Sequence, residues 1–365
     1  MPFEHYVQKG TQKLRMGFTT GSCAALAAKA ATIMLLTGES IEEVDIITPV
    51  GLPIVVPVLE KEMESDSVSC AVQKDAGDDP DITDGLLVYA KVHKTGTPGV
   101  NIDGGPGIGR VTRPGLDQPA GAAAINRVPR QMIESSVQEI CNRCDYKGGI
   151  DVLISIPKGI ELAGRTFNPR LGIEGGISVL GTSGVVKPMS MQALIDCIGV
   201  ELRALAAEGH DKVVLTPGNY GEAFIAAHPF LSIAPVVKCS NFIGDALDFA
   251  AAYGFTKILL VGHIGKFIKL AGGIMNTHSG VADCRMELLT AHAALAGAKQ
   301  ETVAELMKAV SIDACIKILD ECGLRAAVIS SLLRNIHINL KRRAGESIGI
   351  STVLFSNVYG LLGKS

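Results

Sequence analysis

Short apolar segments with little polar alternation dominate the second half of the chain. Four of them predict strands, at residues 177–180, 212–215, 236–239 and 257–261, and helical patterns lie at 189–207 and 245–253. Strands of this kind, alternating with helices, are typical of a parallel sheet covered on both faces. Further helices are expected at 281–296, 303–309, 312–321 and 325–340, before a last strand at 348–355. The second half is therefore predicted to be a doubly wound domain with a mainly parallel sheet and a helical tail.

The first half follows a different pattern. An alanine-rich helix is predicted at 22–36, ending near Gly38, and a second helix begins at Pro129 and runs to about residue 144. Strands are predicted at 44–47 and 52–58, which form a hairpin, and at 67–72, 86–92 and 150–156. Hairpins mixed with two helices indicate an α+β domain. We expect residues 1–170 to form this first domain and residues 171–365 to form the second.

Composition narrows the class of protein. The chain has 365 residues, of which 47% are hydrophobic and 19% charged, and its net charge is −3. Such a chain can bury two sizeable cores, and the lack of a basic tract argues against a nucleic-acid partner. No signal peptide is apparent, and no apolar run approaches the roughly 18 residues of a membrane span. Nine scattered cysteines suit a reducing compartment. We therefore expect a cytoplasmic protein without membrane contact, and a homo-oligomer remains open.

Each strand predicted in the second half ends in a distinctive loop. The loops are GTSG at 181–184, TPGNYGE at 216–222, SNFIGD at 240–245 and GHIGK at 262–266. Ligands of open parallel sheets bind beyond the carboxyl ends of the strands, where such loops converge. The amides of a glycine loop and of the helix after it can bind an anion or a nucleotide. The glycines taken singly are equally well explained by tight turns.

Two other loops carry candidates for acid–base chemistry. The segment 74–81, KDAGDDPD, clusters Asp75, Asp78 and Asp79, and neighbouring carboxylates raise one another's pKa. The alternative for this loop is a solvated turn capped by its own Asp side chains. His263 lies in a polar loop and is a second candidate base.

Hydroxyl side chains precede the alanine-rich helix, at Thr19, Thr20 and Ser22. The unpaired amides at the start of a helix can hold a carboxylate or a phosphate, which makes this a candidate anion site. The simpler interpretation is that Thr20 or Ser22 only caps the helix. The pair Cys141 and Cys144 is expected to be neither metal-bound nor disulfide-linked, because a lone C-x-x-C supplies at most half a zinc site.

Several of these segments resemble one known family. They are MGFTTGSCAALAAKAA at 16–31, VQKDAGDDPDITDG at 72–85, NIDGGPGIGRVTRPGL at 101–116, INRVPRQMI at 125–133, TFNPRLGIEGGISVLGTSGVVKPMS at 166–190, VLTPGNYGE at 214–222 and LLVGHIGK at 259–266. In this order they are similar to the CbiD family, the cobalt-precorrin-5B carbon-1 methyltransferases of anaerobic cobalamin biosynthesis. The match covers residues 16–266, and Ser22 in TTGSC is a small departure from the pattern.

The resemblance implies methyl transfer from S-adenosylmethionine to a ring carbon of a tetrapyrrole, giving cobalt-precorrin-6A. Cobalt would belong to this small-molecule substrate, so no protein metal site is expected. The resemblance brings no catalytic residues with it, and the assignments are our own. We expect Asp75, Asp78, Asp79 or His263 to act as a base if one is needed, and Asp245 or Glu222 to accept hydrogen bonds from the ribose. The full expected cofactor set is Gly181, Thr182, Ser183, Gly184, Gly218, Asn219, Glu222, Asn241, Asp245 and Gly262.

The substrate is ringed by carboxylates, so its pocket should offer cations and helix N-termini. The expected substrate-binding residues are Thr19, Thr20, Ser22, Lys74, Arg170 and Lys187, drawn from both halves, and Arg110, Arg113, Arg127 and Arg130 also flank the glycine loops. Two other classes of protein remain open. One is a different nucleotide-dependent enzyme such as a dehydrogenase, against which the lack of a complete G-x-G-x-x-G argues. The other is a tetrapyrrole carrier without catalytic activity.

Overall fold

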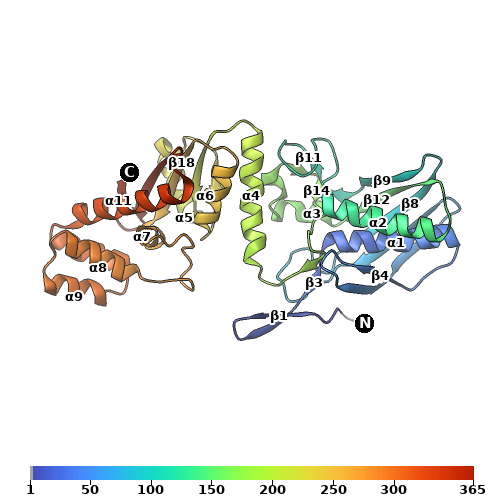
Figure 1. The fold of residues 1–365 in the computed structure, drawn as a ribbon, viewed down its shortest axis with the longest axis horizontal. Helices are drawn as coiled ribbons and strands as arrows, with labels where there is room; N and C mark the ends of the chain where they lie inside the picture. The colour runs from blue at the N-terminus through green and yellow to red at the C-terminus, as the bar shows by residue number, and fades with distance from the viewer. Residues whose placement is uncertain (1–2) are drawn as a thin grey trace. The chain divides into compact units, whose positions relative to one another are not determined.

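The computed structural model describes residues 3–365, which divide after Met191 into two compact units, the second being Gln192–Ser365 (Figure 1). Both units mix helices and strands, which confirms the expected mixed α/β class. The division lies after Met191, later than the boundary we expected. Residues 171–190, which we assigned to the second domain, therefore belong to the first unit.

The first unit is built on a five-stranded sheet whose order is β6-β7-β8-β12-β9. Its strands are β6 (Leu59–Met63), β7 (Ser67–Gln73), β8 (Leu87–Thr95), β12 (Gly149–Ser155) and β9 (Gly99–Gly104). All neighbours are antiparallel except β12 and β9. Helices α1 (Thr20–Thr37) and α2 (Arg127–Arg143) pack against each other and against this sheet (Figure 1). Helices and strands thus agree with the predicted α+β pattern.

Helix α1 is the centre of the first core. Thr19 caps its N-terminus, because its hydroxyl accepts from the Ser22 amide, and Gly38 ends it in the left-handed conformation. Its alanines leave room for α2, β7 and β8 to approach closely. By length and composition α1 could cross a membrane, which corrects our expectation that no apolar segment approaches that length. Most of the helix is buried inside the unit, and a core helix has the same composition.

Short strand pairs complete the first unit. Two are hairpins, β1 (Tyr6–Lys9) with β2 (Gln12–Arg15) and β4 (Glu43–Ile47) with β5 (Pro53–Pro57); the second was predicted. Three join segments far apart in sequence: β3 (Gly17–Phe18) with β15 (Val185–Val186), β10 (Gly107–Ile108) with β14 (Gly176–Ile177), and β11 (Arg110–Val111) with β13 (Ile173–Glu174). Between β12 and β13 in the sequence lie three short helical turns, α3 (Gly159–Leu162), η1 (Ala163–Arg165) and η2 (Asn168–Leu171).

The second unit contains the parallel sheet that the sequence predicted. Its order is β17-β16-β18-β19-β20, with strands β16 (Lys212–Thr216), β17 (Val236–Lys238), β18 (Lys257–His263), β19 (Gly349–Ser356) and β20 (Gly360–Lys364). The first four are parallel, and β20 is an antiparallel edge strand that we had not predicted. Apolar residues are buried on both faces, in a larger and a smaller cluster.

Helices cover this sheet and continue beyond it. They are α4 (Met191–Ala207), α5 (Asn219–Ala227), α6 (Ile243–Ala252), α7 (Ile264–Ala271), α8 (Arg285–Leu295), α9 (Gln300–Lys308), α10 (Ile312–Glu321) and α11 (Arg325–Ala344), with a short turn η3 (Pro229–Leu231). Helices α5 and α7 occupy segments that we had described only as loops.

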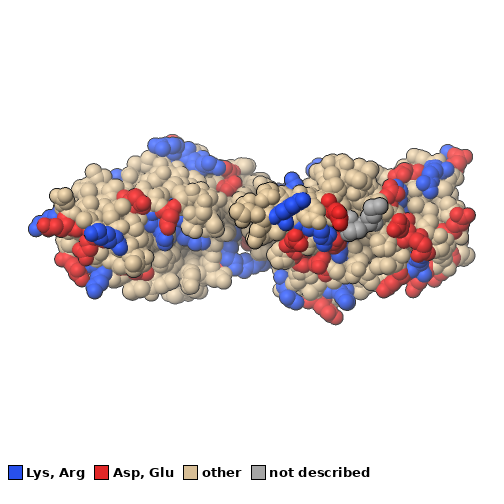
Figure 2. All heavy atoms as spheres, turned by 90° about the horizontal axis from the view of Figure 1, so that it is seen from below, with Lys and Arg blue, Asp and Glu red and all other residues tan. Residues whose placement is uncertain are grey.

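On the face shown in Figure 2, acidic and basic side chains are interspersed over both units.

One predicted strand is wrong. Residues 177–180 were expected to begin the parallel sheet, but only Ile177 belongs to a strand, and that strand, β14, pairs with β10 in the first unit. The loop 181–184 therefore does not join the three loops that follow β16, β17 and β18. Three strand-end loops converge at the edge of the parallel sheet, and not four.

Candidate active site

The strand order of the second unit marks one edge of its sheet as a ligand site. Counted along the chain, the order β17-β16-β18-β19-β20 is 2-1-3-4-5. The connection after β16 leads to β17 on one side, and the connection after β18 leads to β19 on the other side. In folds of this kind a crevice opens between the loops that follow two such strands. In open α/β sheets, ligands bind in this crevice, at the carboxyl ends of the strands. The segments after these two strands begin at Pro217 and at Ile264.

The loop after β16 leads directly into a helix. Gly218 is the N-cap residue of α5, and Asn219 begins this helix, exposed to solvent. Glu222, in the first turn of α5, has its Oε2 3.0 Å from Lys238 Nζ, which also donates to Asn219 Oδ1 at 3.4 Å. Lys238 thus contacts both side chains, and its contact with Asn219, which is exposed, is the longer of the two.

The loop after β17 is held in an unusual conformation. Ser240 has a φ of 52°, a left-handed value that costs a non-glycine residue roughly 1–3 kcal/mol and is often found at functional sites. The next residue, Asn241, accepts at Oδ1 from Lys266 Nζ (2.9 Å) and from Thr277 Oγ1 (3.2 Å). Sequence reasoning missed Lys266 and Thr277, although Lys266 ends the quoted motif LLVGHIGK and could have been found there.

His263 is the N-cap of α7. Its Nδ1 accepts from the Gly265 amide at 3.0 Å, so the ring carries its proton on Nε2 when neutral. Burial lowers the pKa of His263, against a smaller upward contribution from Asp313. To act as a base through Nε2, the ring would have to move its proton to Nδ1 and lose the cap. The geometry therefore favours a structural role over the catalytic role that we expected.

Two further predicted residues at this edge, Gly262 and Asp245, differ in what they can offer a ligand. Gly262 is buried inside β18, where any side chain would collide with the ring of Phe267, so its role is close packing. Asp245 lies half-buried in the first turn of α6, and its charge helps to raise the pKa of Arg343. Only Asp245 of these two has a polar side chain to offer a ligand.

The polar groups at the start of α1 in the first unit are hydrogen-bonded to carbonyls of the same chain, at residues 180 and 184. The amides of Thr19 and Gly21 donate to Gly184 O and Leu180 O, at 3.1 Å each. Ser22 Oγ donates to Gly184 O at 2.6 Å. Thr20 Oγ1 donates to Leu180 O and accepts from the Leu180 amide. The three hydroxyls that we assigned to the substrate are buried: those of Thr20 and Ser22 bond to residues 180 and 184, and that of Thr19 bonds to Ser22. In this conformation they do not form an anion site.

In the loop 181–184, neighbouring side chains leave no space for a side chain at either glycine. Gly181 and Gly184 have φ values of 130° and 78°. A side chain on Gly181 would collide with Thr19, and one on Gly184 would meet Thr48 and Pro49. Ser183 Oγ donates to Val185 O at 2.9 Å, which closes the turn locally, while Thr182 is exposed. The two glycines are therefore explained by a turn with positive φ values and by neighbouring side chains, which agrees with the simpler of our two interpretations, a tight turn.

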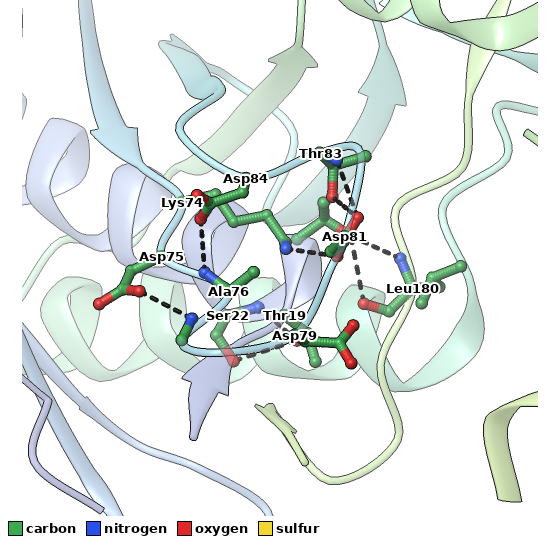
Figure 3. A network of polar contacts seen from close by, with 12 residues as sticks. Thr19, Ser22, Lys74, Asp75, Ala76, Asp79, Asp81, Thr83, Asp84 and Leu180 are labelled. Atoms are coloured by element: carbon green, nitrogen blue, oxygen red, sulfur yellow. Dashed lines mark hydrogen bonds and ion pairs between the residues drawn. The ribbon is translucent and has the colours of Figure 1, made fainter. Parts of the chain in front are cut away.

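The acidic loop forms a network of internal hydrogen bonds (Figure 3). Asp75 accepts from both terminal nitrogens of Arg15 at 2.5 and 2.7 Å, and this bond is the main reason that the pKa of Asp75 is lowered. Asp78 accepts from the Arg15 amide and Asp79 from the Met189 amide. A carboxylate with a lowered pKa is a weak base. The lowered pKa of Asp75, and the backbone amides that Asp78 and Asp79 accept from, favour a structural role over the catalytic role that we expected.

Lys74 is buried at the base of the same loop. Its Nζ lies 2.6 Å from Asp81 Oδ2 (Figure 3). Burial acts to raise the pKa of Asp81, but the charge of Lys74 and hydrogen bonds from Lys74 and Thr83 outweigh it and lower the pKa. Because Lys74 is 2% exposed, its side chain is a structural cation in this conformation. It does not reach a substrate at the surface.

The other predicted cations fall into two groups. Arg110 is paired with Asp103, and Arg130 donates to the carbonyls of Ile125 and Ile102, so both brace the first unit. Arg110 is nevertheless exposed, as are the remaining cations Arg113, Arg127, Arg170 and Lys187. Arg113 also donates to Arg170 O. The described residues contain no group of His, Cys, Asp and Glu that could hold a metal ion, and Cys141 and Cys144 are both free thiols.

The fold defines a two-unit α/β protein whose second unit has the strand order of a doubly wound, ligand-binding sheet. Comparison with known families identifies it further: residues 7–188 match the model of the CbiD family, and residues 276–365 match that of the CbiD C-terminal domain. The chain belongs to the CbiD family. This confirms the resemblance drawn from the sequence motifs.

Similar proteins cover the chain almost completely. A protein of Ruminiclostridium cellulolyticum is 46% identical over 97% of this chain and 92% of its own length, and one of Treponema denticola is 42% identical over 99% and 100%. Both are named cobalt-precorrin-5B C(1)-methyltransferase. A crystal structure of the cobalamin biosynthesis protein CbiD from Archaeoglobus fulgidus is 27% identical, with a TM-score of 0.42 over 77% of this chain and 87% of the other.

Proposed function

We propose that the protein is an S-adenosylmethionine-dependent methyltransferase that acts on carbon 1 of cobalt-precorrin-5B and gives cobalt-precorrin-6A. The observation that carries this proposal is the near full-length identity, 42–46%, to proteins named for that activity. The reaction transfers the sulfonium methyl group to the ring carbon. The carbon–sulfur bond breaks, its electron pair stays on sulfur, and S-adenosylhomocysteine leaves.

The crevice of the second unit is our proposed site for S-adenosylmethionine. Support comes from the strand order 2-1-3-4-5, which places the loops after β16, β17 and β18 around one switch point. Gly218 and Asn219 would approach the nucleoside, with Asn241 opposite. Asp245 would accept from the ribose hydroxyls, because Glu222 already accepts from Lys238. Residues 181–184 drop out of this proposal, since they belong to the first unit.

Methyl transfer of this kind depends mainly on positioning the two reacting atoms. A chain that only holds both molecules in line needs no side-chain base of its own. This agrees with the state of Asp75, Asp78, Asp79 and His263, each of which is engaged in a structural hydrogen bond. Exposed Arg170 and Lys187 remain proposed partners for the carboxylates of the tetrapyrrole.

The activity is tested by incubating the protein with cobalt-precorrin-5B and methyl-¹³C S-adenosylmethionine. We expect one labelled methyl group on carbon 1, seen by NMR, and one equivalent of S-adenosylhomocysteine. Tetrapyrrole binding without methyl transfer would instead support a carrier. Bound NAD(H) fluorescence together with an absence of S-adenosylmethionine binding would support a dehydrogenase.

The placement of the cofactor is tested separately by calorimetry with S-adenosylhomocysteine. Asn219→Ala and Asp245→Ala should each weaken binding about tenfold, the loss of one good hydrogen bond to a charged or ribose group. Lys212→Met, at the opposite end of β16, is the matched control and should bind normally. Normal affinity in both site variants would rule out this crevice as the cofactor site.

A further inference from the structure

Helix α7 carries two lysines one turn apart whose surroundings differ. Lys269 is 2% exposed; its Nζ donates to Thr277 O at 3.1 Å and lies 4.0 Å from Asp283. Lys266 is half-buried, and its Nζ donates to Asn241 Oδ1 at 2.9 Å. Within residues 3–365, Lys266 makes no ion pair with a carboxylate. Its ammonium group therefore lacks a counter-anion at a site where burial lowers its pKa.

Asn241 is oriented so that its amide nitrogen is left for a ligand. Both Lys266 and Thr277 donate to Oδ1, and the Thr277 amide donates to the Asn241 carbonyl at 2.9 Å. In the described part of the chain, no acceptor bonds to Asn241 Nδ2. The left-handed Ser240 fixes the backbone just before this side chain. Two donors, Lys266 Nζ and Asn241 Nδ2, are thus held at the switch point.

Neighbouring groups do not supply the missing negative charge. Burial raises the pKa of the Cys239 thiol to about 12, so this thiol is neutral at physiological pH. Glu222 is paired with Lys238. His263 cannot serve either, because it is neutral or cationic.

We propose that Lys266 Nζ and Asn241 Nδ2 bind a carboxylate group of a ligand at the carboxyl edge of the second unit's sheet. The proposal rests on the proposed function, under which two carboxylates can reach this edge. One is the amino-acid carboxylate of S-adenosylmethionine, and the other is a side-chain carboxylate of the tetrapyrrole. The chemistry is the same in both cases: a charge-assisted hydrogen bond from the ammonium and a second bond from the amide.

The test compares Lys266→Met with Lys257→Met in the full-length protein. Lys257 is an exposed lysine at the start of β18, the strand that leads into α7, so it controls for the loss of one positive charge at the far end of the same strand–helix segment. The ligands are S-adenosylhomocysteine, its decarboxylated analogue and cobalt-precorrin-5B, with affinities measured by calorimetry. Thermal unfolding checks that both variants keep the wild-type fold.

We expect Lys266→Met to weaken one carboxylate-bearing ligand about tenfold or more. The decarboxylated analogue should bind the variant and the wild type equally, and Lys257→Met should bind all three ligands normally. A loss confined to S-adenosylhomocysteine identifies its carboxylate as the partner. A loss confined to cobalt-precorrin-5B identifies the tetrapyrrole instead. Either result supports the site.

Two results would overturn the proposal. One is wild-type affinity of Lys266→Met for all three ligands, and the other is an equal loss for S-adenosylhomocysteine and its decarboxylated analogue. An acetate titration followed by ¹³C NMR at the lysine ε-carbons judges the site without either ligand. Acetate should shift the Lys266 signal more than that of Lys257. If acetate does so while neither natural ligand binds, the proposed function fails and the carboxylate site stands.

Discussion

Two turns of this protein look alike in sequence and differ in structure. Residues 181–184 and residues 262–266 each offer glycines next to a helix start. In the first unit, Gly184 and Leu180 direct their carbonyls at the start of α1 and satisfy its amides and hydroxyls. In the second, the chain leaves the Lys266 ammonium and the Asn241 amide without a carboxylate partner in the described residues. The comparison teaches that a ligand site is marked by donors left unused, and that glycines near a helix can simply report crowding.

The largest effect should come from removing the buried cation of the first unit, Lys74, at the base of the acidic loop. Lys74→Met removes the partner of a largely buried Asp81 and should lower the free energy of unfolding by about 3–5 kcal/mol. Chemical denaturation of the purified variant measures this. Lys158→Met, at an exposed lysine of the same unit that has no proposed role in binding, is the control and should leave the midpoint unchanged. A stable Lys74→Met that loses substrate binding would return Lys74 to the substrate site.

A smaller loss is expected from crowding the turn. Gly181→Ala puts a methyl group against Thr19 at a φ of 130° and should destabilise the protein by about 2–3 kcal/mol. Gly209→Ala is the control for the cost of placing alanine at a positive φ, because Gly209 has a φ of 89° and open space around it. Affinity for S-adenosylhomocysteine should not change in either variant. A tenfold weaker affinity in a folded Gly181→Ala would bring this loop back into the cofactor site.

The third prediction separates a cap from a base at His263. His263→Ala should cost about 1 kcal/mol of stability, the usual effect of losing an N-cap. His263→Asn should restore most of it, since Asn is a good N-cap, and should methylate at a rate within a few-fold of wild type. Single-turnover methylation decides the matter. A fully folded His263→Asn with a hundredfold slower reaction would show that the imidazole takes part in the chemistry.

The smallest effect is a change in pH dependence. Arg15 lowers the pKa of Asp75 in the folded protein, so this carboxylate stabilises the fold above its unfolded pKa of about 3.9. The stabilisation is lost as the pH falls below that value through the lowered folded pKa. In Asp75→Asn, the unfolding midpoint should depend less steeply on pH below about 4. The difference should be modest, because the pair is partly exposed to solvent.

Regular elements with local signals could be predicted from the sequence. Helix α1 begins and ends close to the expected residues, because Thr19 and Gly38 are strong caps that act on their neighbours. The hairpin of β4 and β5 and the apolar strands β16, β17 and β18 also lie where expected. Each of these signals is written within a few residues of the element it specifies.

Pairings between distant segments could not be predicted. Gly176 and Ile177 look like the start of a buried strand, and only their partner, β10, assigns them to the first unit. The same limit applies to the site. Asp75 and His263 are residue types that can serve as bases, but Arg15 and Gly265, their partners, decide that they act as structural acceptors. Lys266 stands out only once its surroundings show that no carboxylate accompanies it.

The pairing of β3 with β15 has a consequence for synthesis on the ribosome. Residues 17–18 emerge early, yet their strand partners are residues 185–186, and the carbonyls that complete the start of α1 come from residues 180 and 184. Contacts so distant in sequence form slowly. During translation, the amides at the start of α1 therefore lack these hydrogen-bond acceptors until nearly the whole first unit has been synthesised. A ribosome that stalls before residue 186 would present quality-control proteases with an unfinished core.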